Sequence, residues 1–158
     1  MPTAHDFSLR TIDGKPLPMK SFAGKPVLVV NVASFCGLTP QYTDLEKLHE
    51  AYGAKGLVVL GVPCNDFGAQ EPKSEGEIAK FCQTSYGVKF PLASKEKVIG
   101  PDAHPLYKWI KDSLGEEALP KWNFHKYLIG KDGALRETFG SRVSPAAPEV
   151  TKAIEAAL

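Results

Sequence analysis

The feature that most constrains the fold is the apolar run VLVVNV at residues 27–32, which Cys36 follows after a short turn. β-Branched residues dominate this run, so we expect a strand from Pro26 to Val32 that is buried on both faces. Thr39 and Pro40 then predict the start of a helix, with Thr39 as its cap and Pro40 in its first turn. A cysteine between such a strand and a helix is expected at the carboxyl edge of a parallel sheet, where open α/β sheets hold their sites.

Strands and helices alternate along the rest of the chain. The patterns predict a hairpin near residues 6–20, a strand at 57–62, a helix opened by Ser74 and Glu77, a short strand at 90–92, a helix from Pro105, a hairpin at 126–139 around Asp132-Gly133, and a final helix through Val150, Ile154 and Leu158. A β-α-β half followed by a β-β-α half is the thioredoxin arrangement. We therefore expect an α/β, thioredoxin-like fold with a mixed central sheet flanked by helices, an N-terminal β-hairpin, and a single domain over residues 1–158.

Charge and hydropathy limit the partners that the chain can have. The formal net charge is +1, so no strong field attracts nucleic acid or an anionic membrane. The apolar runs are shorter than the roughly 20 residues that a spanning helix needs. The first ten residues lack a basic flank followed by an apolar stretch, so no secretory signal is predicted and the cytoplasm is the expected compartment.

The chain has three cysteines, Cys36, Cys64 and Cys82. Their odd number and wide spacing do not fit a secreted disulfide framework, so thiols are expected. No pair of cysteines or histidines has the spacing of a zinc site, which disfavours a metal-binding module. Neither a metal nor a cofactor is expected.

Cys36 is the candidate nucleophile. A helix start carries partial positive charge, which favours the reactive thiolate over the thiol. Thr39 occupies the place where a Cys-x-x-Cys motif would have its second cysteine, so dithiol exchange by that motif is excluded. A lone thiolate suits attack on a small electrophile such as a peroxide, which would leave a sulfenic acid. The alternative is a small apolar filler at a crowded turn.

Three segments carry a resemblance to a known family. The stretches NVASFCGLTPQY (31–42), GVPCNDFGAQEP (61–72) and KWNFHKYLIGKDG (121–133) resemble the three signatures of the glutathione peroxidases, in the same order. The resemblance implies a thioredoxin-like fold and reduction of hydroperoxides at Cys36. It also implies a catalytic tetrad in which Gln70, Trp122 and Asn123 accompany Cys36. These three side chains carry N–H donors that would stabilise a thiolate and orient a bound peroxide.

The resemblance also bears on the reductant. Cysteine in place of selenocysteine implies thioredoxin as the preferred reductant, with glutathione as the other candidate. The segment before the third signature is short, as in the compact, monomeric members of the family. An open site of this kind would admit lipid hydroperoxides as well as hydrogen peroxide.

Cys82 resembles the resolving cysteine of the thioredoxin-dependent members, which would form a Cys36–Cys82 disulfide. It lies one position before the plant-type resolving cysteine, which would match Gln83, and one residue is about 100° of helix rotation. Bacterial relatives resemble this chain in having the earlier position. Such a helix would have to unwind to bring the two sulfurs together. The alternative is a buried structural cysteine beside Ile78 and Phe81.

The leading hypothesis is a thiol peroxidase that reduces hydrogen peroxide and organic or lipid hydroperoxides and is recycled by thioredoxin or glutathione. A redox sensor or relay, which passes its oxidation to a partner protein, would use the same residues and stays open. Nucleic-acid binding has no support, because the chain has no basic stripe and no matching motif.

Overall fold

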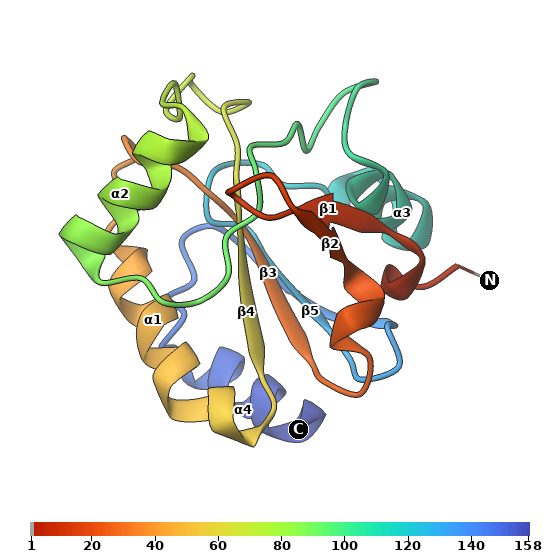
Figure 1. Ribbon diagram of the computed structural model, residues 1–158. Coiled ribbons are helices and arrows are strands. Elements are labelled where there is room, and N and C mark those ends of the chain that lie inside the picture. The colour runs from red at the N-terminus through yellow and green to blue at the C-terminus, as the bar shows by residue number, and fades with distance from the viewer. Residues whose placement is uncertain (1) are drawn as a thin grey trace.

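The computed structural model describes residues 2–158, which form two sheets and four α-helices (Figure 1). The strands are β1 (Ser8–Arg10), β2 (Pro16–Pro18), β3 (Val27–Val32), β4 (Val58–Pro63), β5 (Lys126–Ile129) and β6 (Leu135–Phe139). The α-helices are α1 (Gln41–Tyr52), α2 (Glu75–Tyr86), α3 (Pro105–Leu114) and α4 (Pro148–Ala157). Short 3-10 helices span Ala4–Asp6, Met19–Phe22, Gly53–Lys55 and Glu116–Ala118.

The larger sheet is mixed, with the strand order β4-β3-β5-β6. β3 pairs in parallel with β4, and β5 pairs antiparallel with both β3 and β6. β1 and β2 form a separate antiparallel hairpin near the N-terminus. The expected α/β class, with a mixed central sheet and an N-terminal hairpin, is therefore confirmed.

Both faces of the sheet are covered, which explains why β3 is apolar at nearly every position. Side chains alternate between the faces of a strand. Leu28 and Val30 pack into one core with α1, α2 and α4, whereas Val27 and Val29 pack into a second core with α3 and the hairpin. Figure 1 shows these groups of elements on opposite sides of β3 and β4.

Several predicted element boundaries are confirmed. Ser74 and Glu77 form the predicted capping box at the start of α2. Gly87 ends this helix with a φ of 61°, which glycine adopts at little cost. The turn between β5 and β6 includes Gly133, whose φ is 82°.

Two local predictions are wrong. Thr39 does not cap α1, which begins at Gln41 after Pro40 without a side-chain cap, because the Thr39 hydroxyl is bonded inside the preceding turn. The short strand predicted at 90–92 is reduced to isolated bridges at Leu92 and Ala93. Proline at position 91 has no N–H to donate, which keeps a regular ladder from forming there.

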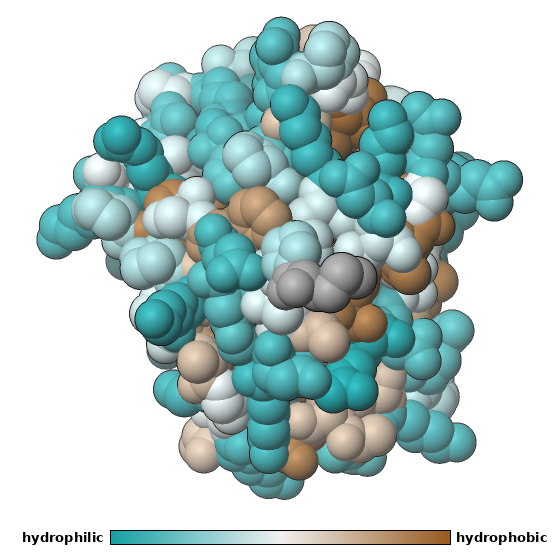
Figure 2. Space-filling model, turned by 90° about the vertical axis from the view of Figure 1, so that its right-hand side faces the viewer, coloured by the Kyte–Doolittle hydropathy of each residue, from teal (hydrophilic) through white to brown (hydrophobic). Residues whose placement is uncertain are grey.

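The face of the molecule on the α3 side carries mainly polar side chains (Figure 2). Figure 2 shows the face on the α3 side, where hydrophilic residues predominate and hydrophobic ones form separate small areas. None of the helices in residues 2–158 combines the length and the apolar character that crossing a bilayer requires.

Candidate active site

Three loops meet at one edge of the larger sheet. β3 and β4 are parallel, so the segments that follow Val32 and Pro63 leave from the same edge. β5 is antiparallel to β3, and Lys126 pairs with Val30, so the segment before β5 reaches this edge as well. The candidate residues lie on these loops: Cys36 is on the first, Gln70 is on the second, and Trp122 and Asn123 are on the third.

The turn after β3 holds Cys36 by its backbone. The Thr39 hydroxyl accepts a hydrogen bond from the Cys36 N–H at 3.0 Å and donates one to the Ala33 carbonyl at 2.8 Å. The Leu38 N–H points at the Cys36 Sγ, 3.3 Å away, where it can stabilise negative charge on the sulfur. The sulfur therefore receives its donor from this turn, because α1 begins only at Gln41.

Gln70 and Asn123 are joined although they lie on different loops. The Asn123 Nδ2 donates to the Gln70 Oε1 at 3.0 Å, and Asn123 is fully buried. The Phe35 N–H donates to the Gln70 carbonyl at 3.0 Å, which ties this pair to the residue before Cys36. The side-chain bond uses the oxygen of Gln70, so its NH₂ group keeps donor capacity.

Backbone strain occurs beside both amides. Ala69, which precedes Gln70, has a φ of 51°, and Phe124, which follows Asn123, has a φ of 66°. Such angles are unfavourable for residues with a Cβ and cluster at functional sites. The surrounding contacts hold both amide-bearing loops in conformations that the isolated segments would avoid.

Trp122 is packed along one side and exposed along the other. Its backbone is held by the Asn31 Nδ2, which donates to the Trp122 carbonyl at 3.0 Å. Its ring lies 5.9 Å from the Phe67 ring, measured between centroids, and rests against Gly68, where a Cβ would come within 3.1 Å of the indole. The side chain remains 37% exposed, which is unusual for a residue that serves only the core.

The three cysteines are free and buried, and they divide between the two cores. Cys36 and Cys82 belong to the core shared with α1 and α4, whereas Cys64 lies in the core on the other face of the sheet. Burial raises the pKa of Cys82 to about 11, although the Tyr42 hydroxyl opposes the shift, and burial raises the pKa of Cys64 to about 12. In this closed conformation Cys82 is a protonated, packed thiol.

Glu71 is a polar residue that the sequence interpretation missed. It is fully buried directly after Gln70, and neither carboxylate oxygen has a hydrogen-bond partner within residues 2–158. Burial raises the pKa of its carboxyl, against the opposing influence of Ser34 and of the Lys95 and Lys73 charges. The sequence signal is that this glutamate directly follows Gln70, a residue of the expected tetrad.

Lys126 is a second missed residue. It is fully buried, and its ammonium donates to the carbonyls of Phe124 at 2.7 Å, Ser141 at 3.3 Å and Gly140 at 3.4 Å. Burial lowers the pKa of Lys126 to about 7. The sequence signal is a lysine directly before an apolar run. The Lys126 ammonium holds the loop that carries Asn123, because it donates to the Phe124 carbonyl in that loop.

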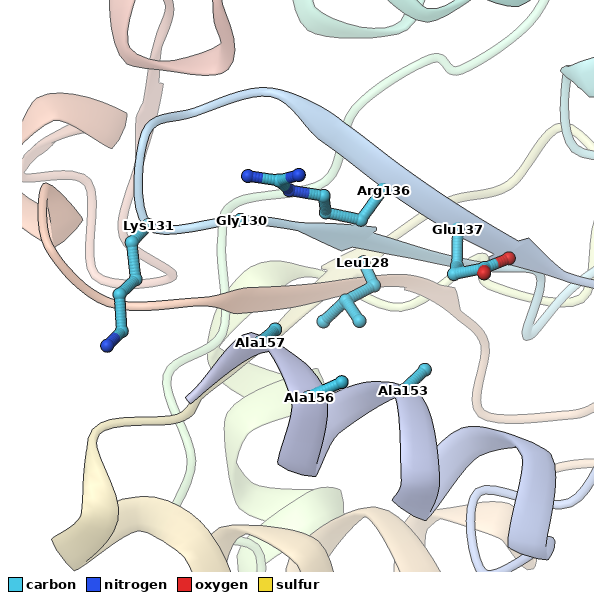
Figure 3. A pocket seen from close by; sticks show the side chains of 8 residues that line it. All are labelled: Leu128, Gly130, Lys131, Arg136, Glu137, Ala153, Ala156 and Ala157. Atoms are coloured by element: carbon cyan, nitrogen blue, oxygen red, sulfur yellow. The ribbon is translucent and has the colours of Figure 1, made fainter.

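Two further features of residues 2–158 lie outside this site or do not add to it. Among the described residues, no three histidine, cysteine, aspartate or glutamate side chains form a group that could hold a metal ion. A pocket of about 370 Å³ lies between α4 and the β5–β6 hairpin (Figure 3). Its lining, which includes Leu128, Arg136 and Ala153, contains neither a cysteine nor any of the candidate residues.

The chain is similar in sequence to known proteins. The family profile described as glutathione peroxidase matches residues 4–111. The chain is 50% identical over 151 residues to the hydroperoxy fatty acid reductase Gpx2 of Synechocystis sp., covering 96% of each protein. It is 45% identical over 159 residues to the glutathione peroxidase-like peroxiredoxin GPX5 of Chlamydomonas reinhardtii, covering 98% of each.

Similar solved structures include proteins with names of the same kind. The apo crystal structure of Trgpx is 36% identical, with a TM-score of 0.79, and covers 99% of this chain and 96% of its own. The crystal structure of T. cruzi GPX1 is 31% identical, with a TM-score of 0.74, and the match covers 96% of this chain and 92% of that one. A thioredoxin family thiol:disulfide interchange protein from Chlorobium tepidum, at 17% identity and a TM-score of 0.71, shares the fold. The chain therefore has a thioredoxin-like fold and belongs to the glutathione peroxidase family.

Proposed function

We propose that this protein is a thiol peroxidase in which Cys36 reduces hydroperoxides, with Gln70, Trp122 and Asn123 as its hydrogen-bond donors. The observation that carries the proposal is the turn after β3, where the Leu38 N–H faces the Cys36 sulfur. In the same turn, the Phe35 N–H donates to the Gln70 carbonyl. The family's peroxidase activity supports the same reaction.

The first step is attack of the Cys36 thiolate on the terminal peroxide oxygen. A sulfur–oxygen bond forms, the oxygen–oxygen bond breaks, and the second oxygen leaves as water or an alcohol after taking a proton. Sulfur is thereby oxidised to a sulfenic acid. The N–H groups of Gln70, Asn123 and Trp122 would orient the peroxide and stabilise the charge that develops on the leaving oxygen.

The second step would be resolution by Cys82. Its thiol condenses with the sulfenic acid, water leaves, and a Cys36–Cys82 disulfide forms. A thiol reductant then restores both thiols by exchange. We propose thioredoxin for this step, with glutathione as the other candidate, and we propose that the protein acts as a monomer in the cytoplasm. The place of Cys36 and Cys82 in one core, apart from Cys64, supports this pairing.

We also propose that the substrates include organic hydroperoxides with apolar chains. Phe35, the residue before Cys36, is 57% exposed, and Trp122 also presents part of its ring to solvent. Exposed aromatic rings on the two loops offer an apolar chain a surface to lie on. The name of the Synechocystis relative, a hydroperoxy fatty acid reductase, supports this substrate class.

Peptide mapping tests the assignment of the cysteines. Reduced protein receives one equivalent of hydrogen peroxide, free thiols are alkylated, and the digest is analysed by mass spectrometry. We expect a Cys36–Cys82 disulfide with Cys64 alkylated. Oxidised Cys36 beside free Cys82 would instead mean that an external thiol resolves the sulfenic acid.

Variants test the catalytic role. Cys36→Ser should abolish peroxide consumption, whereas Cys64→Ala should retain it because Cys64 lies in the other core. Cys82→Ser should leave the first oxidation intact and stop turnover with thioredoxin. Substantial activity in Cys36→Ser would refute the proposed reaction. A disulfide trapped with a protein other than thioredoxin would favour the relay.

A further inference from the structure

The Lys73 ammonium lies over two aromatic rings that belong to different segments. Its Nζ is 4.1 Å from the centroid of the Phe81 ring and 4.9 Å from that of the Phe35 ring. Both distances fall within the range of a cation–π interaction. Lys73 itself is half-buried, and its ammonium contacts both rings.

Each ring adjoins one of the two cysteines of the proposed cycle. Phe35 directly precedes Cys36 in the turn after β3, and Phe81 directly precedes Cys82 within α2. Lys73 is the residue before the N-cap of α2. The set of Phe35, Lys73 and Phe81, which we call the clamp, therefore ties the turn of one cysteine to the helix of the other.

The clamp continues into the packing that covers Cys82. The Phe81 ring lies 5.8 Å from the Tyr86 ring, which lies 5.5 Å from the Tyr42 ring. Cys82 is 1% exposed beneath these side chains. A thiol buried to this degree reacts with a second sulfur or with a reagent only when the packing around it opens.

We propose that Lys73 is a positioning residue for the resolving step, whose clamp holds α2 closed and releases Cys82 only when the stack of Phe35, Lys73 and Phe81 separates. This inference rests on the proposed role of Cys82. The step itself is balanced: the Cys82 thiol and the Cys36 sulfenic acid give one sulfur–sulfur bond and one water. Lys73 exchanges neither a proton nor an electron in it.

Alkylation of Cys82 tests the clamp without any peroxide. In a background carrying Cys36→Ser and Cys64→Ala, Cys82 is the only thiol, and its rate of reaction with iodoacetamide reports how often α2 opens. Lys73→Met replaces the aliphatic stem by an apolar chain of similar length and removes the ammonium group. We expect it to raise the rate by about five- to thirtyfold, the effect of losing two partly exposed cation–π contacts.

Two matched variants control this measurement. Lys73→Arg keeps a cation over the rings and should return the rate close to that of the Lys73 protein. Lys80→Met removes the same charge from an exposed position on α2 and should leave the rate unchanged. An unchanged rate in Lys73→Met, or an equal rise in Lys80→Met, would overturn the clamp.

Hydrogen exchange separates local opening from general loss of stability. In Lys73→Met of the otherwise natural chain, the amides of α2 should exchange faster while those of α3 keep their protection. Faster exchange throughout the chain would show that the substitution destabilises the whole fold and would also overturn the proposal.

A stopped-flow experiment with peroxide tests the link to catalysis. Lys73→Met should speed formation of the disulfide and leave the first oxidation of Cys36 unchanged, a split that a merely structural role would not produce. If no Cys36–Cys82 disulfide forms in the natural chain, the proposed role of Cys82 fails, and the link of the clamp to resolution fails with it. The alkylation result still decides whether the clamp holds α2 closed.

Discussion

The hydrogen bonds that hold the Cys36 turn join neutral groups. The Leu38 amide faces the sulfur, and the Gln70–Asn123 pair is bonded to the same turn through Phe35. Neutral dipoles that are already in place stabilise developing charge without the desolvation cost of a buried ion pair. At the scale of residues, the candidate site is therefore held by hydrogen bonds.

Asn123 and Gln70 should act as one unit. Asn123→Ala should lower the rate constant for oxidation by hydrogen peroxide about 10²-fold, the usual effect of losing a preorganised donor. Because the two side chains are bonded to each other, adding Gln70→Ala should cost much less than it costs alone. Stopped-flow rates of the two single variants and the double variant give the coupling. Additive losses would mean that the amides act independently.

Glu71 should make stability depend on pH. Its pKa is raised in the folded chain by burial, so the folded state holds its proton more tightly than the unfolded state does. Its contribution to stability is present below the unfolded pKa and is lost as pH rises through the folded pKa. Urea unfolding at pH 5 and pH 8 should therefore show Glu71→Gln gaining stability relative to the natural chain at the higher pH. The exposed Glu50→Gln should show no such gain.

At the scale of elements, the turn between β3 and α1 determines where Cys36 lies. Thr39 is buried, and its hydroxyl bridges the Cys36 N–H and the Ala33 carbonyl across this turn. The same hydroxyl could have capped α1, but the contact with Ala33 uses it elsewhere. The helix begins later as a result, and the Leu38 N–H is left to face the sulfur.

Thr39→Val tests the turn, because it keeps the shape of the side chain and removes the hydroxyl. Two buried backbone groups would lose their partner, so the free energy of unfolding should fall by about 1–3 kcal/mol. Oxidation of Cys36 should slow as the turn loosens. Thr43→Val, at an exposed position of α1, is the matched control and should change neither quantity appreciably. A normal oxidation rate in Thr39→Val would mean that the turn is held by other contacts.

At the scale of the whole molecule, the sheet separates two cores. Cys36, Cys82 and the packed faces of α1, α2 and α4 share one core, whereas α3 and the hairpin cover the other. α2 lies on the outer side of this arrangement in Figure 1, away from α3. We therefore expect opening of α2 to leave the second core in place.

We accordingly expect oxidation to unfold one helix, α2, and to leave the other helices folded. After one equivalent of hydrogen peroxide, the helical signal in far-UV circular dichroism should fall as α2, one of four α-helices in residues 2–158, unwinds to form the disulfide. Cys82→Ser, treated in the same way, should keep its full signal. A natural chain that forms the disulfide without losing helical signal would show that α2 moves as a rigid body.

Local hydrogen-bond patterns explain which elements could be predicted. Ser74 and Glu77 lie three residues apart and cap α2 as expected, since both partners of that motif are local. Thr39 has the same kind of side chain but does not form the predicted cap, because its acceptor lies six residues back in a turn that forms only when β3 is packed. Lys126 and Glu71 were missed, since their burial depends on segments distant in the sequence.

The sequence by itself determined the alternation of strands and helices, the covering of both sheet faces, and the place of Cys36 after a buried strand, since hydropathy period and turn chemistry are local properties. Only the tertiary structure decided the donor to the Cys36 sulfur, the bond between Gln70 and Asn123, and the stack of Lys73 between Phe35 and Phe81. The physical reason is distance along the chain. Gln70 and Asn123 are 53 residues apart, and their contact exists only once the sheet has brought the two loops to one edge.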